Sequence, residues 1–196
     1  KNLKKIIFCG TIEEYGKSSL PYREKDQPKP TSSYGFAKYS GHKYVLRKIK
    51  ENNYNYTWLR PSLMFGPNDN VKRLLGSIFF NLKRNKIIKI NLGLQKRDFL
   101  YVYDFCKIIF YHIKFYKKFN YKLANISSKN WLYIKDLLKI LKKRIDNKKF
   151  KLIKVNYVKD KSVIINSVNL LRKFHPELKF TPFHKSLKIT LNSYGL

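Results

Sequence analysis

Short runs of β-branched and aromatic residues alternate along this chain with longer segments in which apolar residues recur every three or four positions. The first pattern predicts buried strands and the second predicts amphipathic helices. Strands that alternate with helices are typical of an α/β fold with a mainly parallel sheet. The expected strands span residues 4–9, 56–60, 87–90, 99–102, 122–126 and 150–155.

The expected helices are longer, and the first of them has a clear start. The segment 34–51 contains no proline, and Ser32 or Ser33 directly before it is a residue type that caps helix N-termini. The segment 103–116 carries Phe105, Ile109 and Ile113, an apolar face that we expect to pack in the core. The predicted helices span residues 34–51, 71–85, 103–116 and 131–145, with two shorter ones around Leu170 and Leu187.

The chain is strongly basic, since 43 Lys and Arg residues against 12 Asp and Glu residues give a formal net charge of +31. Such a charge suggests a nucleic-acid partner, because cations neutralise phosphates. However, only 8 of these cations are Arg, the type favoured for base edges and bidentate phosphate contacts, and the cations are spread along the whole chain. We therefore expect no specific nucleic-acid partner, and a basic nucleic-acid-binding module stays as an alternative.

Compartment and metal binding can be addressed from apolar runs, cysteines and histidines. No apolar run approaches the roughly 18 residues that span a bilayer, and the apolar stretch near the N-terminus is too short for a signal peptide. Cys9 and Cys106 form neither a metal-binding pattern nor a disulfide framework. The four histidines show no metal-ligand spacing, and we expect them at the surface or its boundary. The sequence predicts a cytoplasmic protein with no membrane contact and no metal site.

Tyr34 and Lys38 open the predicted helix 34–51 and lie four residues apart. Their side chains therefore fall on one face, about one turn from each other. An ammonium beside a phenol favours the phenolate, which can take a proton from a sugar hydroxyl while a hydride leaves the same carbon. In a chain with 15 Tyr residues and many Lys residues this spacing also arises by chance, so the pair alone does not identify an enzyme.

Four segments that surround this pair occur in a set order. Residues 8–16 read FCGTIEEYG, residues 31–38 read TSSYGFAK, residues 58–67 read WLRPSLMFGP and residues 95–104 read QKRDFLYVYD. Together they resemble the extended short-chain dehydrogenase/reductases, the NAD-dependent epimerase/dehydratase family that acts on nucleotide sugars. The resemblance covers most of residues 4–115.

The resemblance implies roles for four residues at the reacting centre. Tyr34 matches the family's general acid/base, and Lys38 matches the residue that favours the phenolate and holds the nicotinamide ribose. Thr11 matches the Ser or Thr whose hydroxyl bonds to the reacting sugar oxygen. Glu13 matches an acidic residue that family dehydratases and decarboxylases often carry.

The same resemblance implies contacts with the cofactor and the substrate. Pro61 lies where the backbone passes the nicotinamide, so Tyr34, Lys38 and Pro61 are the expected cofactor contacts. Arg97 matches the arginine that grips the pyrophosphate of the nucleotide sugar, a task suited to its planar donor fork. Arg97 and Thr11 are therefore the expected substrate contacts.

Other residues near the motifs are expected to be structural or to break the pattern. We expect Glu14 in a solvated loop, Asp98 as a loop anchor and Asp104 as a helix cap. Many relatives carry an Asn at the position of Leu63 or Met64, and both residues here are apolar. The matching substrate contact is therefore in doubt.

The largest departure from the family is an absence. Its members begin with a βαβ unit whose glycine-rich turn receives the dinucleotide pyrophosphate, and the 8 glycines here form no such pattern. The resemblance thus implies that the first half of the nucleotide-binding domain is missing, as in a fragment or a truncated or split gene. Ile12 stands where one dehydratase subgroup has the Asp of a Thr-Asp-Glu loop, which argues against that subgroup.

The resemblance implies an α/β fold formed by the C-terminal part of a Rossmann-type parallel sheet and a smaller mixed α/β substrate-binding domain. Residues 1–67 and 96–116 are expected to form the partial NAD(P)-binding domain, and residues 68–95 and 117–196 the nucleotide-sugar domain. The implied activity is NAD(P)-dependent chemistry at C4 of a nucleotide-activated hexose, with a 4-epimerase or a 4-keto reductase favoured. The alternative is an inactive fragment of such an enzyme, and a homodimer is possible.

Overall fold

The computed structural model describes residues 3–90, 94–119, 121–145, 152–154 and 163–196. Within these ranges strands and helices alternate as expected, and the chain has an α/β fold. No helix in the described ranges is long and apolar enough to cross a membrane.

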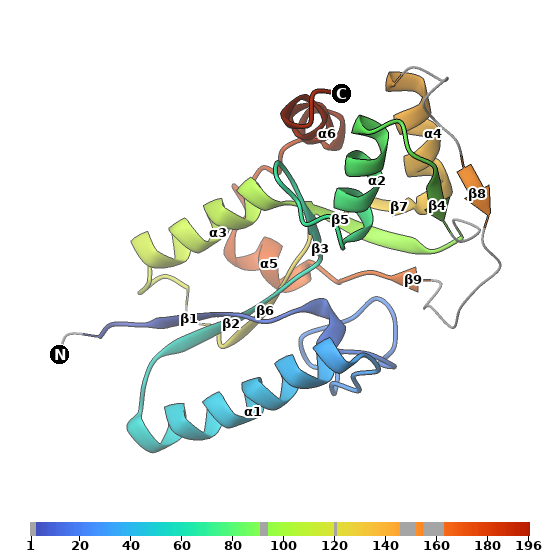
Figure 1. The fold of residues 1–196 in the computed structure, drawn as a ribbon. Helices are drawn as coiled ribbons and strands as arrows, with labels where there is room; N and C mark the ends of the chain where they lie inside the picture. Colours follow the sequence, from blue (N-terminus) through green and yellow to red (C-terminus); the bar gives the residue numbers. More distant parts are fainter. Residues whose placement is uncertain (1–2, 91–93, 120, 146–151, 155–162) are drawn as a thin grey trace.

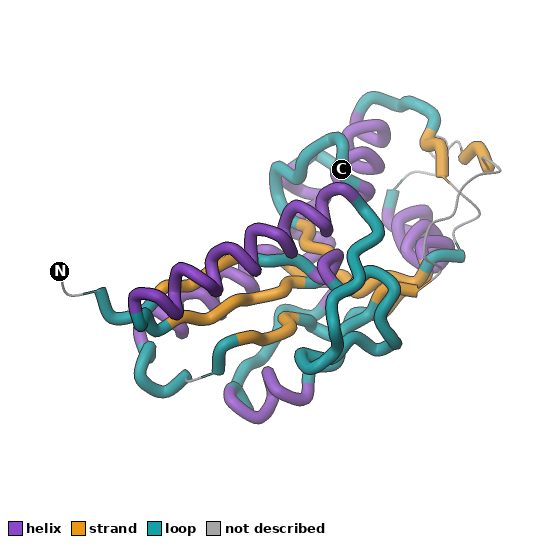
Figure 2. Tube along the Cα trace, turned by 90° about the horizontal axis from the view of Figure 1, so that it is seen from below, coloured by secondary structure: helices purple, strands orange, loops and turns teal. Residues whose placement is uncertain are grey.

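The first sheet is parallel and has the strand order β1–β2–β6. Its strands are β1 (Ile6–Cys9), β2 (Tyr56–Pro61) and β6 (Leu123–Ile126). Helix α1 (Ser33–Asn52) lies along one side of this sheet, and helix α3 (Val102–Lys114) lies on the other (Figure 1). Figure 2 shows α1 running nearly along the strands that it covers. The carboxyl ends of β1 and β2 therefore open toward the start of α1.

Helix α1 begins and ends as its sequence predicts. Ser32 is the N-cap, and its hydroxyl accepts a hydrogen bond from the backbone N–H of Gly35. Asn53 ends the helix in the left-handed region, at φ 51°, a conformation that Asn tolerates better than most residues.

The chain crosses into a second, mixed sheet directly after β2. Its strands are β3 (Leu63–Phe65), β5 (Lys96–Tyr101), β7 (Trp131–Tyr133) and β9 (Val163–Ile164). Strand β5 pairs in parallel with β3 and β9 and antiparallel with β7. A further parallel pair joins β4 (Ile88–Ile90) to β8 (Leu152–Lys154).

Two large hydrophobic cores and a smaller cluster of Ile12, Tyr15 and Tyr22 follow from this arrangement. One joins the second sheet to α2 (Leu74–Lys83), α4 (Ile134–Arg144) and α6 (Phe183–Ser193). The other packs α3 and α5 (Asn169–Phe174) against the parallel sheet, around Leu59, Leu100, Ile108 and Ile126. The pocket described below lies where the two sheets meet, at the crossing from β2 to β3.

Several expected boundaries were wrong, for physical reasons that the structure shows. The helix predicted over 131–145 starts only at Ile134, because Trp131–Tyr133 pairs with β5. The helix predicted over 71–85 is α2, which is shorter at both ends. Ile113, expected in the core, is 62% exposed, since α3 turns that position away from the sheet. Of the strand predicted over 150–155, residues 150, 151 and 155 lie outside the described residues.

The strands of the two sheets do not follow the expected ranges one by one. Strand β6 lies in the range 117–196, yet it pairs with β2 in the parallel sheet. Strand β5 lies in the range 96–116, yet it is the central strand of the mixed sheet. The chain therefore passes between the two sheets at other positions than the expected boundaries.

Candidate active site

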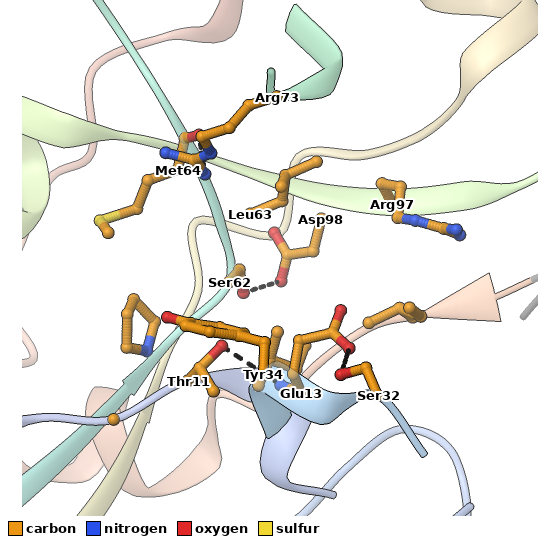
Figure 3. Close-up of a pocket in the computed structure, with 14 residues that line it drawn as sticks. Thr11, Glu13, Ser32, Tyr34, Ser62, Leu63, Met64, Arg73, Arg97 and Asp98 are labelled. Carbon is orange, nitrogen blue, oxygen red and sulfur yellow. Dashed lines mark hydrogen bonds between the residues drawn. The ribbon is translucent and has the colours of Figure 1, made fainter. Parts of the chain in front are cut away.

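A cavity of about 610 Å³ lies between the two sheets. Its walls come from the turn after β1, the start of α1, the β2–β3 crossing, β5, β9 and the segment before α2. Figure 3 shows the side chains that line this cavity. Of the residues that the sequence singled out, Thr11, Glu13, Tyr34, Pro61 and Arg97 all line this cavity.

Thr11 and Glu13 are held by a single 3-10 turn, η1 (Ile12–Glu14). Thr11 caps this turn, and its Oγ1 accepts a hydrogen bond from the Glu13 backbone N–H at 3.3 Å. The Glu13 carboxylate accepts a hydrogen bond of 3.1 Å from the Ser32 hydroxyl, the cap of α1 (Figure 3). The turn and the helix start are therefore tied to each other at the pocket.

Tyr34 and Lys38 lie on the same side of α1, as their spacing predicts. Tyr34 is 56% exposed, and its ring extends over the pocket in Figure 3. The Lys38 Nζ atom lies 6.0 Å from the centroid of that ring. It also donates a hydrogen bond of 3.0 Å to the carbonyl of Cys9, the last residue of β1. The Lys38 side chain thus lies near the Tyr34 ring and contacts the last residue of β1.

The opposite wall carries the basic and apolar groups. Arg97 is largely buried in β5, and its guanidinium donates to the Lys96 carbonyl at 3.1 Å. Leu63 and Met64 give the wall an apolar patch where many relatives were expected to carry an Asn. Arg73 is a lining residue that the sequence reasoning missed, and it donates to the Met64 carbonyl at 2.8 Å.

Glu14 was expected in a solvated loop, and this was wrong. Its side chain is fully buried, and its Oε2 lies 2.7 Å from Arg60 Nη2. Its Oε1 accepts hydrogen bonds of 3.0 Å from the Thr11 backbone N–H and from Trp58 Nε1. Burial alone would raise the pKa of Glu14, but the hydrogen bond from His42 and the charge of Arg60 hold this pKa below its ordinary value. Glu14 is therefore a buried carboxylate.

Asp98 and Asp104 do not lie where the sequence predicts, and Asp98 is also one of the residues that line the cavity. Asp98 lies within β5, where the Ser62 hydroxyl donates to it at 2.8 Å, and burial raises the pKa of its carboxyl group. The amide of Asn166 donates to the same Ser62 hydroxyl at 3.1 Å. Asp104 does not cap α3; it accepts hydrogen bonds from the backbone and hydroxyl of Thr181.

Three of the four histidines were also misplaced by the sequence analysis. His42, His112 and His175 are buried, and only His184 is exposed. Each buried imidazole has a polar partner, which explains how it tolerates burial. Across the described residues, no three His, Cys, Asp or Glu side chains are placed to hold a metal ion together.

Comparison with known proteins decides the family. The sequence model described as the NAD dependent epimerase/dehydratase family matches residues 1–127 of this chain. The chain belongs to this family. The resemblance seen in its motifs is thereby confirmed, and the epimerase/dehydratase match includes the turn with Thr11, the helix with Tyr34 and the strand with Arg97.

Two curated members of the epimerase/dehydratase family show how much of a relative this chain spans. A Methanocaldococcus jannaschii protein, provisionally named a UDP-glucose 4-epimerase, is 34% identical over 114 residues, which are 54% of this chain and 37% of that protein. The dTDP-4-dehydro-6-deoxyglucose reductase of Escherichia coli is 29% identical over 152 residues, which are 74% of this chain and 47% of that protein. The chain spans less than half the length of these two relatives.

A solved structure shows the same fold. UDP-glucuronic acid 4-epimerase from Bacillus cereus, in complex with UDP-glucuronic acid and NAD, matches this chain with a TM-score of 0.87 at 22% identity. The match covers 100% of this chain and 62% of that protein. At this identity the likeness shows the fold alone, and it confirms that the chain has the fold of the C-terminal part of a Rossmann-type enzyme.

Proposed function

We propose that this chain supplies the catalytic half of an NAD(P)-dependent enzyme that acts at C4 of a nucleotide-activated hexose. One observation carries the proposal: the Tyr34 ring lies over the same cavity that Thr11 lines, with the Lys38 ammonium 6.0 Å from the ring centroid. A phenol, a hydroxyl and a cation in this arrangement can remove a proton from a sugar hydroxyl.

The proton steps follow from the chemistry of these side chains. Tyr34 takes the proton of the C4 hydroxyl, with the Lys38 ammonium 6.0 Å from the centroid of its ring. The Thr11 hydroxyl donates a hydrogen bond to the same sugar oxygen and orients it toward Tyr34. Glu13, whose carboxylate accepts a hydrogen bond from Ser32, would act as a second acid or base at a neighbouring carbon.

The residues around Tyr34 fit a nicotinamide cofactor. An ammonium has three donors, and the contact of Lys38 with Cys9 accounts for one of them, which leaves donor capacity for ribose hydroxyls. Pro61 ends β2 at the pocket wall and would lie against the nicotinamide. When bound, NAD or NADP supplies the hydride acceptor and donor for the reaction.

Arg97 supports a diphosphate-containing substrate. Arg97 lines the same cavity as Tyr34, and a guanidinium suits the oxygens of a nucleotide-sugar diphosphate. The apolar patch of Leu63 and Met64 lines this cavity as well. Within this class we favour a 4-epimerase or a 4-keto reductase, because Ile12 interrupts the Thr-Asp-Glu loop of one dehydratase subgroup.

A homodimer and a two-part organisation belong to the same proposal. The outer face of α1 exposes Phe36 and Tyr44, at 63% and 59%, which suits a contact between two copies of this helix. The nucleotide-binding part would comprise residues 1–67 and 96–116, and the nucleotide-sugar part residues 68–95 and 117–196, with β6 joining the first sheet. Light scattering of the purified protein measures the oligomeric state.

The test of the function uses the full gene product with NAD(P) and a panel of UDP- and dTDP-hexoses. We expect turnover of at least one sugar. With a C4 hydroxyl substrate, deuterium at C4 should slow the reaction because the C4–H bond breaks, and with a 4-keto substrate, deuterium on the reduced nicotinamide should appear at C4 of the product. Turnover with neither result would contradict chemistry at C4. Absence of turnover together with no NAD binding in equilibrium dialysis would favour the inactive fragment.

A further inference from the structure

Glu14 gathers donors from three separate elements in the interior next to the pocket. It accepts from the Thr11 backbone N–H after β1, and from Trp58 Nε1 and Arg60 Nε, both in β2, at 3.0, 3.0 and 2.8 Å. His42 Nδ1, from α1, lies 3.4 Å from the same carboxylate. One buried carboxylate therefore joins the catalytic turn, the second strand and the catalytic helix.

The position of His42 connects this contact to the proposed catalytic residues. Tyr34, Lys38 and His42 are spaced by four residues along α1, so they lie in one row on the helix. His42 also stacks on Trp58, with ring centroids 4.0 Å apart and an interplanar angle of 11°. Tyr34 lies at the pocket end of this row, and His42, at the other end, contacts Glu14 and Trp58.

Two glycines let these elements approach each other. A Cβ atom at Gly10 would lie 2.0 Å from Trp58 Nε1 and 2.4 Å from Glu14 Oε1. A Cβ atom at Gly35 would lie 2.5 Å from the Glu13 carbonyl oxygen. A side chain at Gly10 would force Trp58 or Glu14 to move, and one at Gly35 would force η1 and α1 apart.

From these contacts we infer that Glu14 is a positioning residue, which, paired with Arg60, holds the turn of Thr11 at a fixed place relative to Tyr34. The inference rests on the proposed function for its effect on turnover, and on geometry for its effect on the turn. Glu14 is buried and is not among the residues that line the cavity. Its charge keeps the Thr11 hydroxyl and the Tyr34 phenol facing the same substrate atom.

The competing explanation is that the buried pair of Glu14 and Arg60 only stabilises the fold. The two can be separated, because replacing both partners of a buried ion pair by apolar residues is often neutral for stability, whereas removing one is costly. The apolar pair would still leave the Thr11 N–H and Trp58 Nε1 without their acceptor. Stability and turnover should therefore respond differently to the single and the double replacement.

The experiment compares Glu14→Gln with the double variant Glu14→Leu/Arg60→Met in the full gene product. For Glu14→Gln we expect a lower unfolding midpoint, a loss in kcat of tenfold or more and a change in KM below threefold. For the double variant we expect the midpoint to return toward that of the wild type while kcat stays at least tenfold reduced. Return of the wild-type kcat together with stability would overturn the inference.

A control and a second readout make the test independent of the assay. Asp104→Asn breaks another buried carboxylate contact, with Thr181, and should lower stability without lowering kcat. Hydrogen–deuterium exchange of the peptide that contains Thr11 should be faster in the stable double variant than in the wild type. Unchanged exchange of this peptide would overturn the inference, whether or not the wild type turns over a nucleotide sugar. A wild type without turnover would contradict only the proposed function.

Discussion

Two buried polar networks lie at opposite ends of the parallel sheet, and they differ in charge. The charged network, formed by Glu14, Arg60, Trp58 and His42, lies where β1 and β2 end, beside the pocket. The neutral network, formed by His112, Tyr121 and His175, lies near the start of β6. Ligands of open parallel sheets bind at the carboxyl ends of the strands, which is the end that holds the charged network.

In the neutral network each hydrogen bond can be assigned one donor and one acceptor with both imidazoles uncharged. His112 Nδ1 lies 2.7 Å from the Ile108 carbonyl, so this nitrogen must donate and Nε2 must accept from the Tyr121 hydroxyl. His175 Nε2, 2.9 Å from Tyr121, then donates to the hydroxyl oxygen. Burial lowers the pKa of both histidines to about 4 and raises that of Tyr121.

The comparison shows that burial alone does not decide the charge of a side chain. Glu14 is as deeply buried as His112, yet it stays ionised because Arg60 supplies the opposite charge at 2.7 Å. The neutral network has no such partner among its members. We therefore expect changes at the pocket end to affect catalysis and changes at the other end to affect stability.

The largest expected effects come from removing one hydroxyl group, that of Tyr34 at the pocket or that of Tyr121 in the neutral network. Tyr34→Phe should lower kcat by about 10²- to 10⁴-fold, the range for a lost general acid/base, with little change in stability because the ring is 56% exposed. Tyr121→Phe should leave kcat within twofold and lower the free energy of unfolding by about 1–3 kcal/mol, because two imidazoles lose their partner. Steady-state kinetics and urea unfolding measure both. Equal losses of turnover in the two variants would break the comparison.

The next effect is a loss of stability in acid that originates in the neutral network. The pKa of His112 and of His175 is about 4 in the folded chain and about 6.5 in the unfolded chain. The unfolded chain therefore gains protons that the folded chain does not, and stability falls as the pH drops from 6.5 to 4. The expected loss is on the order of 3 kcal/mol per histidine.

Urea unfolding at pH 7 and pH 5 measures this dependence. The variant His112→Gln/His175→Gln should be less stable at pH 7 but should lose less stability on acidification than the wild type. The difference between the two proteins isolates the histidines from the buried carboxyl groups that also titrate. The same pH dependence in both proteins would show that the histidines are not its source.

A smaller effect is expected for the contact with the substrate diphosphate. Arg97→Lys keeps the charge but loses the planar fork, so KM for the nucleotide sugar should rise about tenfold while kcat stays within twofold. Arg47→Lys, on the exposed face of α1, is the matched control and should change neither. An unchanged KM in Arg97→Lys would remove Arg97 from the substrate site.

The smallest effect concerns glycines of α1. A Cβ atom at Gly41 would meet nothing within 4 Å, so Gly41→Ala should raise the free energy of unfolding by about 0.5–1 kcal/mol. Gly35→Ala should instead destabilise the protein and lower kcat, because its Cβ atom would lie 2.5 Å from the Glu13 carbonyl. Thermal unfolding and turnover of the two variants check this contrast. A neutral Gly35→Ala would show that η1 and α1 need not approach so closely.

Much of the fold could be predicted because local pattern and tertiary structure agree. The strand before Gly10, the helix after Ser32 and the strand that ends at Pro61 each have their own periodicity or cap. Strands β3, β7 and β9 could not be predicted so easily, because they are two or three residues long. They exist only through pairing with β5, and such pairing leaves little trace in a local sequence.

The site divides in the same way. Thr11, Tyr34 and Arg97 could be named because they belong to ordered motifs, and the structure places them around one cavity. Glu14 and His42 could not, because an acidic residue in a turn and a histidine in a helix are usually exposed. A weak signal was present: Glu14 lies three residues after Thr11, the spacing of a capping box, which the structure forms.

The central claim is that Tyr34 and Thr11 act on one substrate atom, and a crystal structure of the full gene product with NAD(P) and a bound nucleotide sugar tests it most directly. We expect the Tyr34 phenol oxygen and the Thr11 Oγ1 atom to lie within about 3.2 Å of the same sugar oxygen, at C4. A sugar oriented with C4 away from both groups, or a Tyr34 hydroxyl that bonds only to protein atoms, would contradict the account.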